Sequence, residues 1–166
     1  FFIDTPGAFC GIGAEERGQG EAIARNLLEL SRLKTPIISI VLGEGGSGGA
    51  LALGVCDELA MLENAVYSVI SPRGFASILW KDASREREAA DRLHITAEDL
   101  LKLQVCDAII EEPTGGAHNN PQQTAENISH YLFGALQKIM RKEVAFLLDS
   151  RYNKFRKIGE FDEGLE

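Results

Sequence analysis

Five glycines lie within the seven-residue run Gly43-Glu44-Gly45-Gly46-Ser47-Gly48-Gly49, between two apolar segments. The segment before it, residues 37–42, is short and β-branched, which is typical of a central strand covered on both faces. The segment after it, residues 50–53, predicts a helix that starts where the glycine run ends. Glycines let a backbone approach a ligand closely, and a helix N-terminus presents unpaired N–H groups. The pattern predicts a site for an anion, either a phosphate or an oxyanion that develops during a reaction.

Three chemistries could use this loop. A phosphate-binding loop is excluded, because no Gly-Lys-Ser/Thr follows the glycines and the Asp4-Thr5-Pro6-Gly7 segment precedes them. A serine hydrolase stays an alternative, since the run satisfies Gly-x-Ser-x-Gly and the order Ser47, Asp107, His118 is that of an α/β-hydrolase triad. In the third, the amides of Gly48 and Gly49 hold an oxyanion, where one donor stabilises a transition state by about 3–4 kcal/mol.

The elements that must position this loop alternate along the chain. Short apolar runs predict strands at residues 1–3, 58–62, 65–70 and 107–110, and helical spacing predicts helices at residues 14–33, 75–80 and 97–103, the last capped by Thr96. A long helix is expected from Pro121, with one apolar stripe formed by Ala125, Ile128, Leu132, Leu136, Ile139 and Met140. The pattern indicates one α/β unit that ends in a helical arm.

Composition narrows the class of protein. The 166 residues carry a formal charge of −8, which disfavours nucleic acid and anionic lipid, and we expect no membrane span. The basic cluster Arg151, Lys154, Arg156 and Lys157 is expected to be a solvated helix face. The three cysteines are far apart and form no metal or disulfide pattern, which favours a reducing compartment. The apolar start at Phe1 predicts the middle of a buried strand and hence a fragment of a larger subunit.

Several long motifs together resemble a known family. They are residues 2–8 (Phe-Ile-Asp-Thr-Pro-Gly-Ala), 11–19, 43–50, 67–72 and 115–118 (Gly-Gly-Ala-His). In order and spacing these segments resemble the α subunit of the bacterial and plastid acetyl-CoA carboxylase carboxyltransferase. The resemblance extends from Phe2 to His118, and the chain corresponds to the C-terminal part of the family's subunit.

The resemblance implies a crotonase-like (ClpP-type) β-β-α superhelix lacking its N-terminal portion, with a partial core at residues 1–120 and a helical arm at residues 121–166. It implies transfer of a carboxyl group from carboxybiotin to acetyl-CoA, which gives malonyl-CoA in the first committed step of fatty acid biosynthesis. The implied partners are a β subunit in an α2β2 heterotetramer, the biotin carboxyl carrier protein and, in the full ATP-dependent complex, biotin carboxylase. The implied location is the cytoplasm or the plastid stroma, and the chain would be inactive without its β subunit.

The resemblance also assigns residues. The amides of Gly48 and Gly49 would hold the ureido oxygen of biotin, and no metal would bind to this chain. The implied biotin-binding residues are Asp4, Thr5, Pro6, Gly7, Glu44, Gly45, Gly46, Ser47 and Ser71. Arg73 and Cys10 depart from the family, which usually has an acidic residue and a proline there. Another acyl-CoA, such as propionyl-CoA, and a purely assembling role for the chain stay open as alternatives.

Overall fold

The computed structural model describes residues 1–159. Five strands occur there: β1 (Phe2–Thr5), β2 (Ile38–Gly46), β3 (Glu58–Leu62), β4 (Val66–Ser68) and β5 (Ala108–Ile110). The α-helices are α1 (Ile12–Glu15), α2 (Gln19–Arg32), α3 (Ser47–Gly54), α4 (Pro72–Leu79), α5 (Glu86–Leu93), α6 (Ala97–Lys102), α7 (Pro121–Ile139) and α8 (Val144–Arg156). Two short 3-10 turns lie at Ala83–Arg85 and Ala117–Asn119.

All strand pairs in the sheet are parallel, in the order β1-β2-β3-β5, and β4 pairs with β2. The first half of β2 pairs with β3, whereas its second half, Glu44–Gly46, pairs with β4. One long strand therefore changes partner half-way along its length. This change brings the glycine run beside β4.

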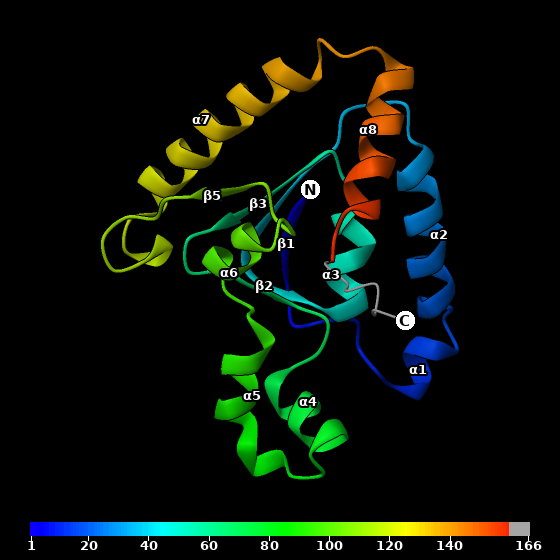
Figure 1. The fold of residues 1–166 in the computed structure, drawn as a ribbon, viewed down its shortest axis with the longest axis vertical. Helices are drawn as coiled ribbons and strands as arrows, with labels where there is room; N and C mark the ends of the chain where they lie inside the picture. The colour runs from blue at the N-terminus through cyan, green and yellow to red at the C-terminus, as the bar shows by residue number, and fades with distance from the viewer. Residues whose placement is uncertain (160–166) are drawn as a thin grey trace, which may run out of the picture.

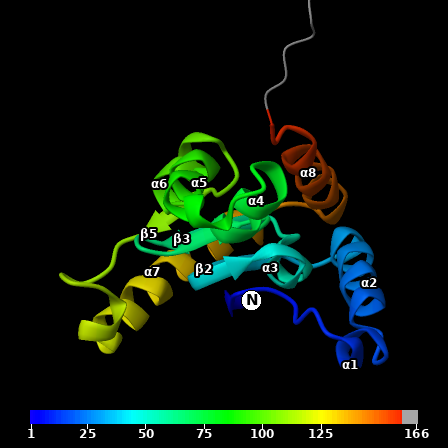
Figure 2. The same cartoon turned by 90° about the horizontal axis from the view of Figure 1, so that it is seen from below.

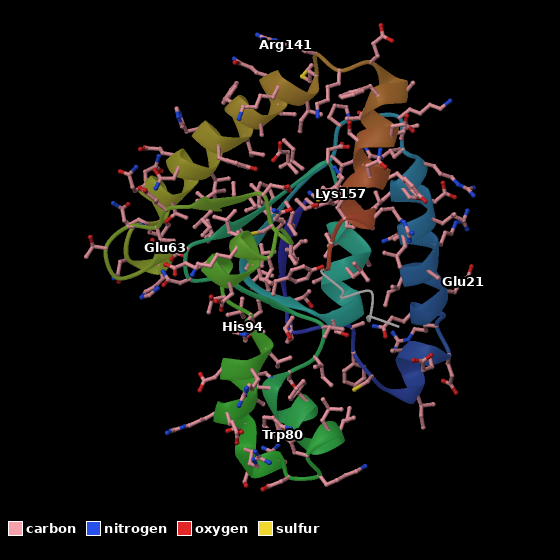
Figure 3. The ribbon with its side chains drawn as sticks, viewed as in Figure 1. Glu21, Glu63, Trp80, His94, Arg141 and Lys157 are labelled. Carbon is pink, nitrogen blue, oxygen red and sulfur yellow. The ribbon has the colours of Figure 1, made fainter. Side chains whose placement is uncertain are left out.

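The helices cover the sheet unequally. In Figure 1, α2 and α8 lie side by side along one flank, and α3 lies between them and the strands. The α4–α5 pair projects from one end of the sheet, with Trp80 in its outer part (Figure 3). In the turned view of Figure 2, the ribbons of α4, α5 and α6 lie on one side of β3 and that of α7 on the other. The glycine run joins β2 to α3 at the end of the sheet from which the α4–α5 pair projects.

Most predicted elements are present, with two changes that affect the site. The strand predicted to end at residue 42 continues through Gly46, and the helix expected at residue 50 begins at Ser47. Gly48 and Gly49 therefore belong to the first turn of α3. The expected helix at residues 14–33 is broken at Gly18, whose φ of 75° no regular helix allows. Helix α5 has no counterpart among the predicted elements.

Helix α7 begins at Pro121, capped by the Asn120 side chain, as expected for a helix from this proline. Its buried face is rotated from the predicted stripe. Thr124, Ala135 and Ile139 are buried, while three residues of the stripe, Ala125, Leu136 and Met140, are exposed. The division into a core at residues 1–120 and an arm at residues 121–166 stays a prediction, and residues 160–166 of that arm lie outside the described residues.

The prediction that the basic cluster of α8 is a solvated helix face is wrong in part. Of its four residues, only Arg156 and Lys157 are exposed. The Arg151 guanidinium is 2% exposed and forms bidentate hydrogen bonds of 2.9 and 2.8 Å to the Asp57 carboxylate. Lys154 forms an ion pair with Asp107. Asp57 and Asp107 also accept hydrogen bonds from the backbone N–H groups of Ile37 and Leu59. Helix α8 therefore holds the edge of the sheet at which the parallel strands begin.

The first residues of the chain also differ from expectation. Ile3 is buried, but Phe1 and Phe2 are 49% and 59% exposed, so the segment is not the middle of a buried strand in this structure. β1 lies at the end of the strand order, and within residues 1–159 it pairs with β2 alone.

The three cysteines should differ sharply in reactivity. Cys10 is exposed, whereas burial raises the pKa of Cys56 and raises the pKa of Cys106 to about 11. Because the thiolate is the nucleophile, iodoacetamide at pH 8 should modify Cys10 in the folded chain and reach Cys56 and Cys106 only after unfolding. Peptide mapping by mass spectrometry measures this order, and modification of Cys106 as fast as Cys10 would contradict the burial described here.

Candidate functional site

Two chain segments meet where β1 and β2 end. The turn after β1 is closed by Thr5, whose hydroxyl accepts a 3.2 Å hydrogen bond from the Gly7 N–H. This turn packs directly on the glycine run. A Cβ on Gly46 would overlap the Pro6 carbonyl and lie 2.8 Å from the Gly7 nitrogen, and a Cβ on Gly49 would lie 2.7 Å from the Ala8 nitrogen. These two glycines are required because backbone packs on backbone.

The first turn of α3 presents free amides. Gly46 is the N-cap, and no side chain caps the helix. The N–H groups of Ser47, Gly48 and Gly49 therefore have no partner within the helix. Among residues 1–159, no hydrogen bond outside the regular elements engages these N–H groups. The turn can accept negative charge from a ligand.

Ser47 has a backbone conformation that is uncommon for a residue with a side chain, with φ of 48°. It stands at the junction of β2 and α3, where the chain reverses from extended to helical. Backbone strain of this kind is concentrated at sites that a fold holds in place for binding or catalysis. The strained backbone of Ser47 therefore supports a role of the loop in binding or catalysis.

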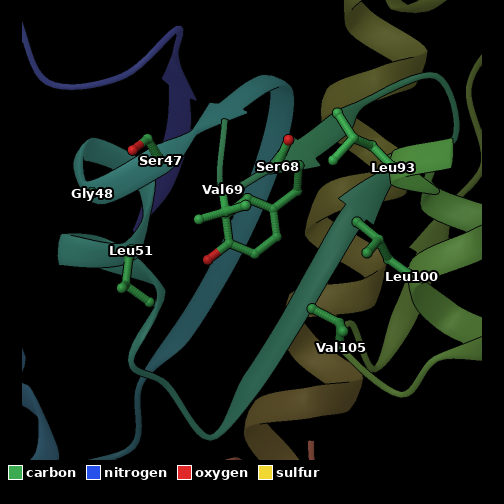
Figure 4. A pocket seen from close by; sticks show the side chains of 9 residues that line it. Ser47, Gly48, Leu51, Ser68, Val69, Leu93, Leu100 and Val105 are labelled. Atoms are coloured by element: carbon green, nitrogen blue, oxygen red, sulfur yellow. The ribbon is translucent and has the colours of Figure 1, made fainter. Parts of the chain in front are cut away.

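Two cavities meet at Ser47 and Ser68. The α5–α6 cavity, of about 300 Å³, has Ser47 and Gly48 at one side and a mainly apolar wall (Figure 4). That wall consists of Leu51, Val69, Leu93, Leu100 and Val105, with Tyr67. The turn cavity, of about 260 Å³, is lined by Pro6, Glu44, Gly45, Gly46, Ser47, Val66, Ser68, Ile70, Ser71, Pro72 and Ile95.

Two of the serine hydroxyls in these walls are engaged already. The Ser68 hydroxyl donates to the Ile70 carbonyl at 2.5 Å, and the Ser71 hydroxyl accepts from the Gly74 N–H at 3.1 Å as the cap of α4. Burial raises the pKa of Tyr67, so its phenol stays protonated at neutral pH and can donate a hydrogen bond. The polar groups that a ligand could meet are therefore the backbone N–H groups of α3 and the side chains of Ser47, Glu44 and Tyr67.

The predicted site residues lie in one region of the structure, but some line a cavity and others do not. Pro6, Glu44, Gly45, Gly46, Ser47 and Ser71 line the turn cavity, and Gly48 lines the α5–α6 cavity. Asp4, Thr5, Gly7 and Gly49 line neither cavity and instead hold the two segments together. Leu93, Leu100 and Val105 line the site without having been predicted, because α5, α6 and the segment after α6 carry no local pattern that points to it. Ser68 belongs to the 67–72 motif but was not predicted as a site residue.

The hydrolase triad is not assembled. Ser47 follows β2, whereas Asp107 precedes β5, so the two lie at opposite edges of a parallel sheet. Asp107 is engaged by Leu59 and Lys154, and His118 lies in a separate cavity with Glu63 and Glu112. The positions of these groups do not support nucleophilic catalysis by Ser47.

Within residues 1–159 there is no group of three or more His, Cys, Asp or Glu side chains placed to hold a metal ion. No helix in the same residues has both the length and the apolar character needed to cross a membrane.

The comparisons with known sequences all point to one family. The sequence profile described as "Acetyl co-enzyme A carboxylase carboxyltransferase-like" matches residues 1–159. The acetyl-coenzyme A carboxylase carboxyl transferase subunit alpha of Clostridium botulinum is 62% identical over 161 residues, which are 97% of this chain and 59% of that protein. The protein of the same name from Shouchella clausii is 61% identical over 98% of this chain and 50% of its own length. The chain therefore spans little more than half of these relatives.

Solved structures agree on the fold. A Pseudomonas malonate decarboxylase hetero-tetramer in complex with coenzyme A has a TM-score of 0.73 at 18% identity, covering 93% of this chain and 62% of that chain. The transcarboxylase 12S structure has a TM-score of 0.70 at 20% identity, covering 86% of this chain and 27% of that chain. These structures share the fold of this chain, which confirms the expected crotonase-like α/β fold.

Proposed function

Because this chain belongs to the acetyl-CoA carboxylase carboxyltransferase α family, we propose that it forms the biotin-facing part of a carboxyltransferase that converts acetyl-CoA to malonyl-CoA. The carboxyl donor is carboxybiotin carried by a biotin carboxyl carrier protein. The active assembly is an α2β2 heterotetramer in the cytoplasm, or in the plastid stroma of a plant, within a complex that includes biotin carboxylase.

One observation carries this proposal. The first turn of α3 has free amides at Ser47, Gly48 and Gly49, and Gly48 opens on a cavity with a mainly apolar wall. A ureido ring has a polar oxygen and an apolar body, so both parts of the site match it. The amides are held by the Pro6–Ala8 backbone, so they need no reorganisation when charge develops.

Carboxybiotin would supply the activated carboxyl group when bound. The residues of this chain would then bind and orient the group and exclude water from it. The Gly48 and Gly49 amides bind the ureido oxygen and stabilise negative charge there, while Leu51 and Val69 exclude water from the ring.

Acyl selection would belong to the β subunit, since the amides and the apolar wall of this chain would face biotin. A propionyl-CoA carboxyltransferase would use the same amides in the same way. The relatives' shared name favours acetyl-CoA. Assay of the full-length complex with both malonyl-CoA and methylmalonyl-CoA separates the two substrates.

The Gly48 amide can be tested with a matched pair of variants. A Cβ on Gly48 would have its nearest contact at 3.7 Å, to the Ile23 side chain, so Gly48→Ala should fold normally. Gly48→Pro adds the same Cβ, closes a ring to the backbone nitrogen through two further carbons and removes the N–H, and proline is tolerated in the first turn of a helix. In the full-length α2β2 complex, Gly48→Pro should lower kcat about 100-fold relative to Gly48→Ala. The measurement is the reverse reaction of malonyl-CoA with a free biotin derivative.

Two further results bear on the proposal. Ser47→Ala should retain substantial activity, because the hydroxyl is not a nucleophile in this scheme. Equal kcat values for Gly48→Pro and Gly48→Ala, with both complexes assembled, would remove the amide mechanism. Gly49→Pro is a poorer probe, because any Cβ there lies 2.7 Å from the Ala8 nitrogen and would disturb the turn as well.

A further inference from the structure

β1 and β2 lose their regular register beside Asp4. Ile3 pairs with Val41 and Thr5 pairs with Gly45, so β2 advances from Val41 to Gly45 while β1 advances only from Ile3 to Thr5. β2 therefore carries a bulge over residues 42–44. Bulges bend a strand and redirect the residues that follow, and they are frequent next to active sites.

The Asp4 side chain occupies the gap that the bulge opens. The Glu44 N–H donates to Asp4 Oδ1 at 3.0 Å, where a regular ladder would offer a backbone carbonyl. A Cβ on Gly43 would lie 2.8 Å from the same oxygen, so the carboxylate rests against the bulged backbone. Glu44 itself is exposed. Asp4, and not Glu44, supplies the carboxylate that holds the glycine run.

The bulge stands where β2 changes partner. Up to Val41, β2 pairs with β3, and from Glu44 it pairs with β4. Two residues after Glu44 comes Gly46, the N-cap of α3. The direction in which the α3 amides point thus depends on how the bulge is held.

We infer that Asp4 is a positioning residue, which fixes the bulge of β2 and thereby aims the Gly48 and Gly49 amides. This role rests on the proposed function and differs from a wall of the biotin pocket, since Asp4 lines neither cavity. One of its two carboxylate oxygens, Oδ1, is engaged by the Glu44 amide. In this role Asp4 acts on the ligand through the glycine run.

The test uses the full-length α2β2 complex and the reverse reaction of malonyl-CoA with free biocytin. Asp4→Ala removes the acceptor, so kcat should fall about tenfold, as expected for one lost hydrogen bond to a charged group. Asp4→Asn keeps an oxygen at the same place and should stay within about threefold of wild type. KM for malonyl-CoA should change by less than about twofold in both variants, because CoA binding is left to the partner.

Asp82→Ala is the matched control, since Asp82 also accepts a 3.0 Å hydrogen bond from a backbone N–H, at Ser84 in the loop after α4. Its kcat should equal that of wild type. A wild-type kcat in Asp4→Ala, or equal losses in Asp4→Ala and Asp4→Asn, would overturn the positioning role while the proposed function stands. An inactive wild-type complex that is correctly assembled would instead reject the proposed function. Size-exclusion chromatography and the melting temperature establish assembly and folding for each variant.

Discussion

Arg151→Met should lower the free energy of unfolding by about 3–5 kcal/mol, the usual cost of removing one partner of a buried ion pair. Arg151 and Asp57 are 2% and 4% exposed. The guanidinium donates to the Asp57 carboxylate and to the carbonyl oxygens of Leu30, Leu33 and Thr35. Methionine fills a similar volume but leaves a buried carboxylate and three carbonyls without their donor. Urea unfolding of the full-length chain measures the loss.

Arg156→Met is the control on the same helix, since Arg156 is exposed and its replacement should change stability by less than about 0.5 kcal/mol. Arg151→Lys should recover little, because an ammonium cannot reproduce a planar fork of five donors. The double variant Arg151→Met/Asp57→Asn should lose less than the sum of its single variants. A loss of under about 1 kcal/mol for Arg151→Met would show that the network contributes little to the fold.

This network also shows what local sequence can and cannot predict. Thr96 and Pro121 mark helix starts correctly, because a cap and a first-turn proline act within a few residues of themselves. The local sequence predicts a solvated charge at Arg151, because its partner Asp57 lies 94 residues away and only the folded chain brings the two together. The same limit explains α7, whose apolar residues do not show which of them face the sheet.

The glycine run was predictable as a candidate site, but its backbone structure was not. Its composition indicates a ligand-binding backbone between a strand and a helix, and α3 does present free amides there. Nothing in the run favours a strand, since glycine is depleted in strands. Residues 43–46 are extended because β4 and Asp4 hold them from either side. The wall formed by α5 and α6 comes from distant segments, so only the fold could place it.

Gly46→Ala should disrupt the site more than any conservative change elsewhere in it. The new Cβ would overlap the Pro6 carbonyl and lie 2.8 Å from the Gly7 nitrogen, and neither backbone atom can rotate away as a side chain could. The turn after β1 and the glycine run must then separate, which moves the N-cap of α3. We expect a loss of about 1–3 kcal/mol in the free energy of unfolding, as for overpacked sites. Because a misplaced reacting group can cost about 100-fold in rate, kcat of the full-length complex should fall by at least that factor.

Gly20→Ala provides the comparison, because the same added methyl group meets nothing within 4 Å in the first turn of α2. That variant should keep full activity and melt at the same temperature or slightly higher, since alanine favours a helix over glycine. The two substitutions are chemically identical, so any difference between them reports only the space around each glycine. If Gly46→Ala kept the kcat and the stability of Gly20→Ala, the turn and the glycine run would not be in the contact described here, and the held amides on which the proposed chemistry depends would lose their support.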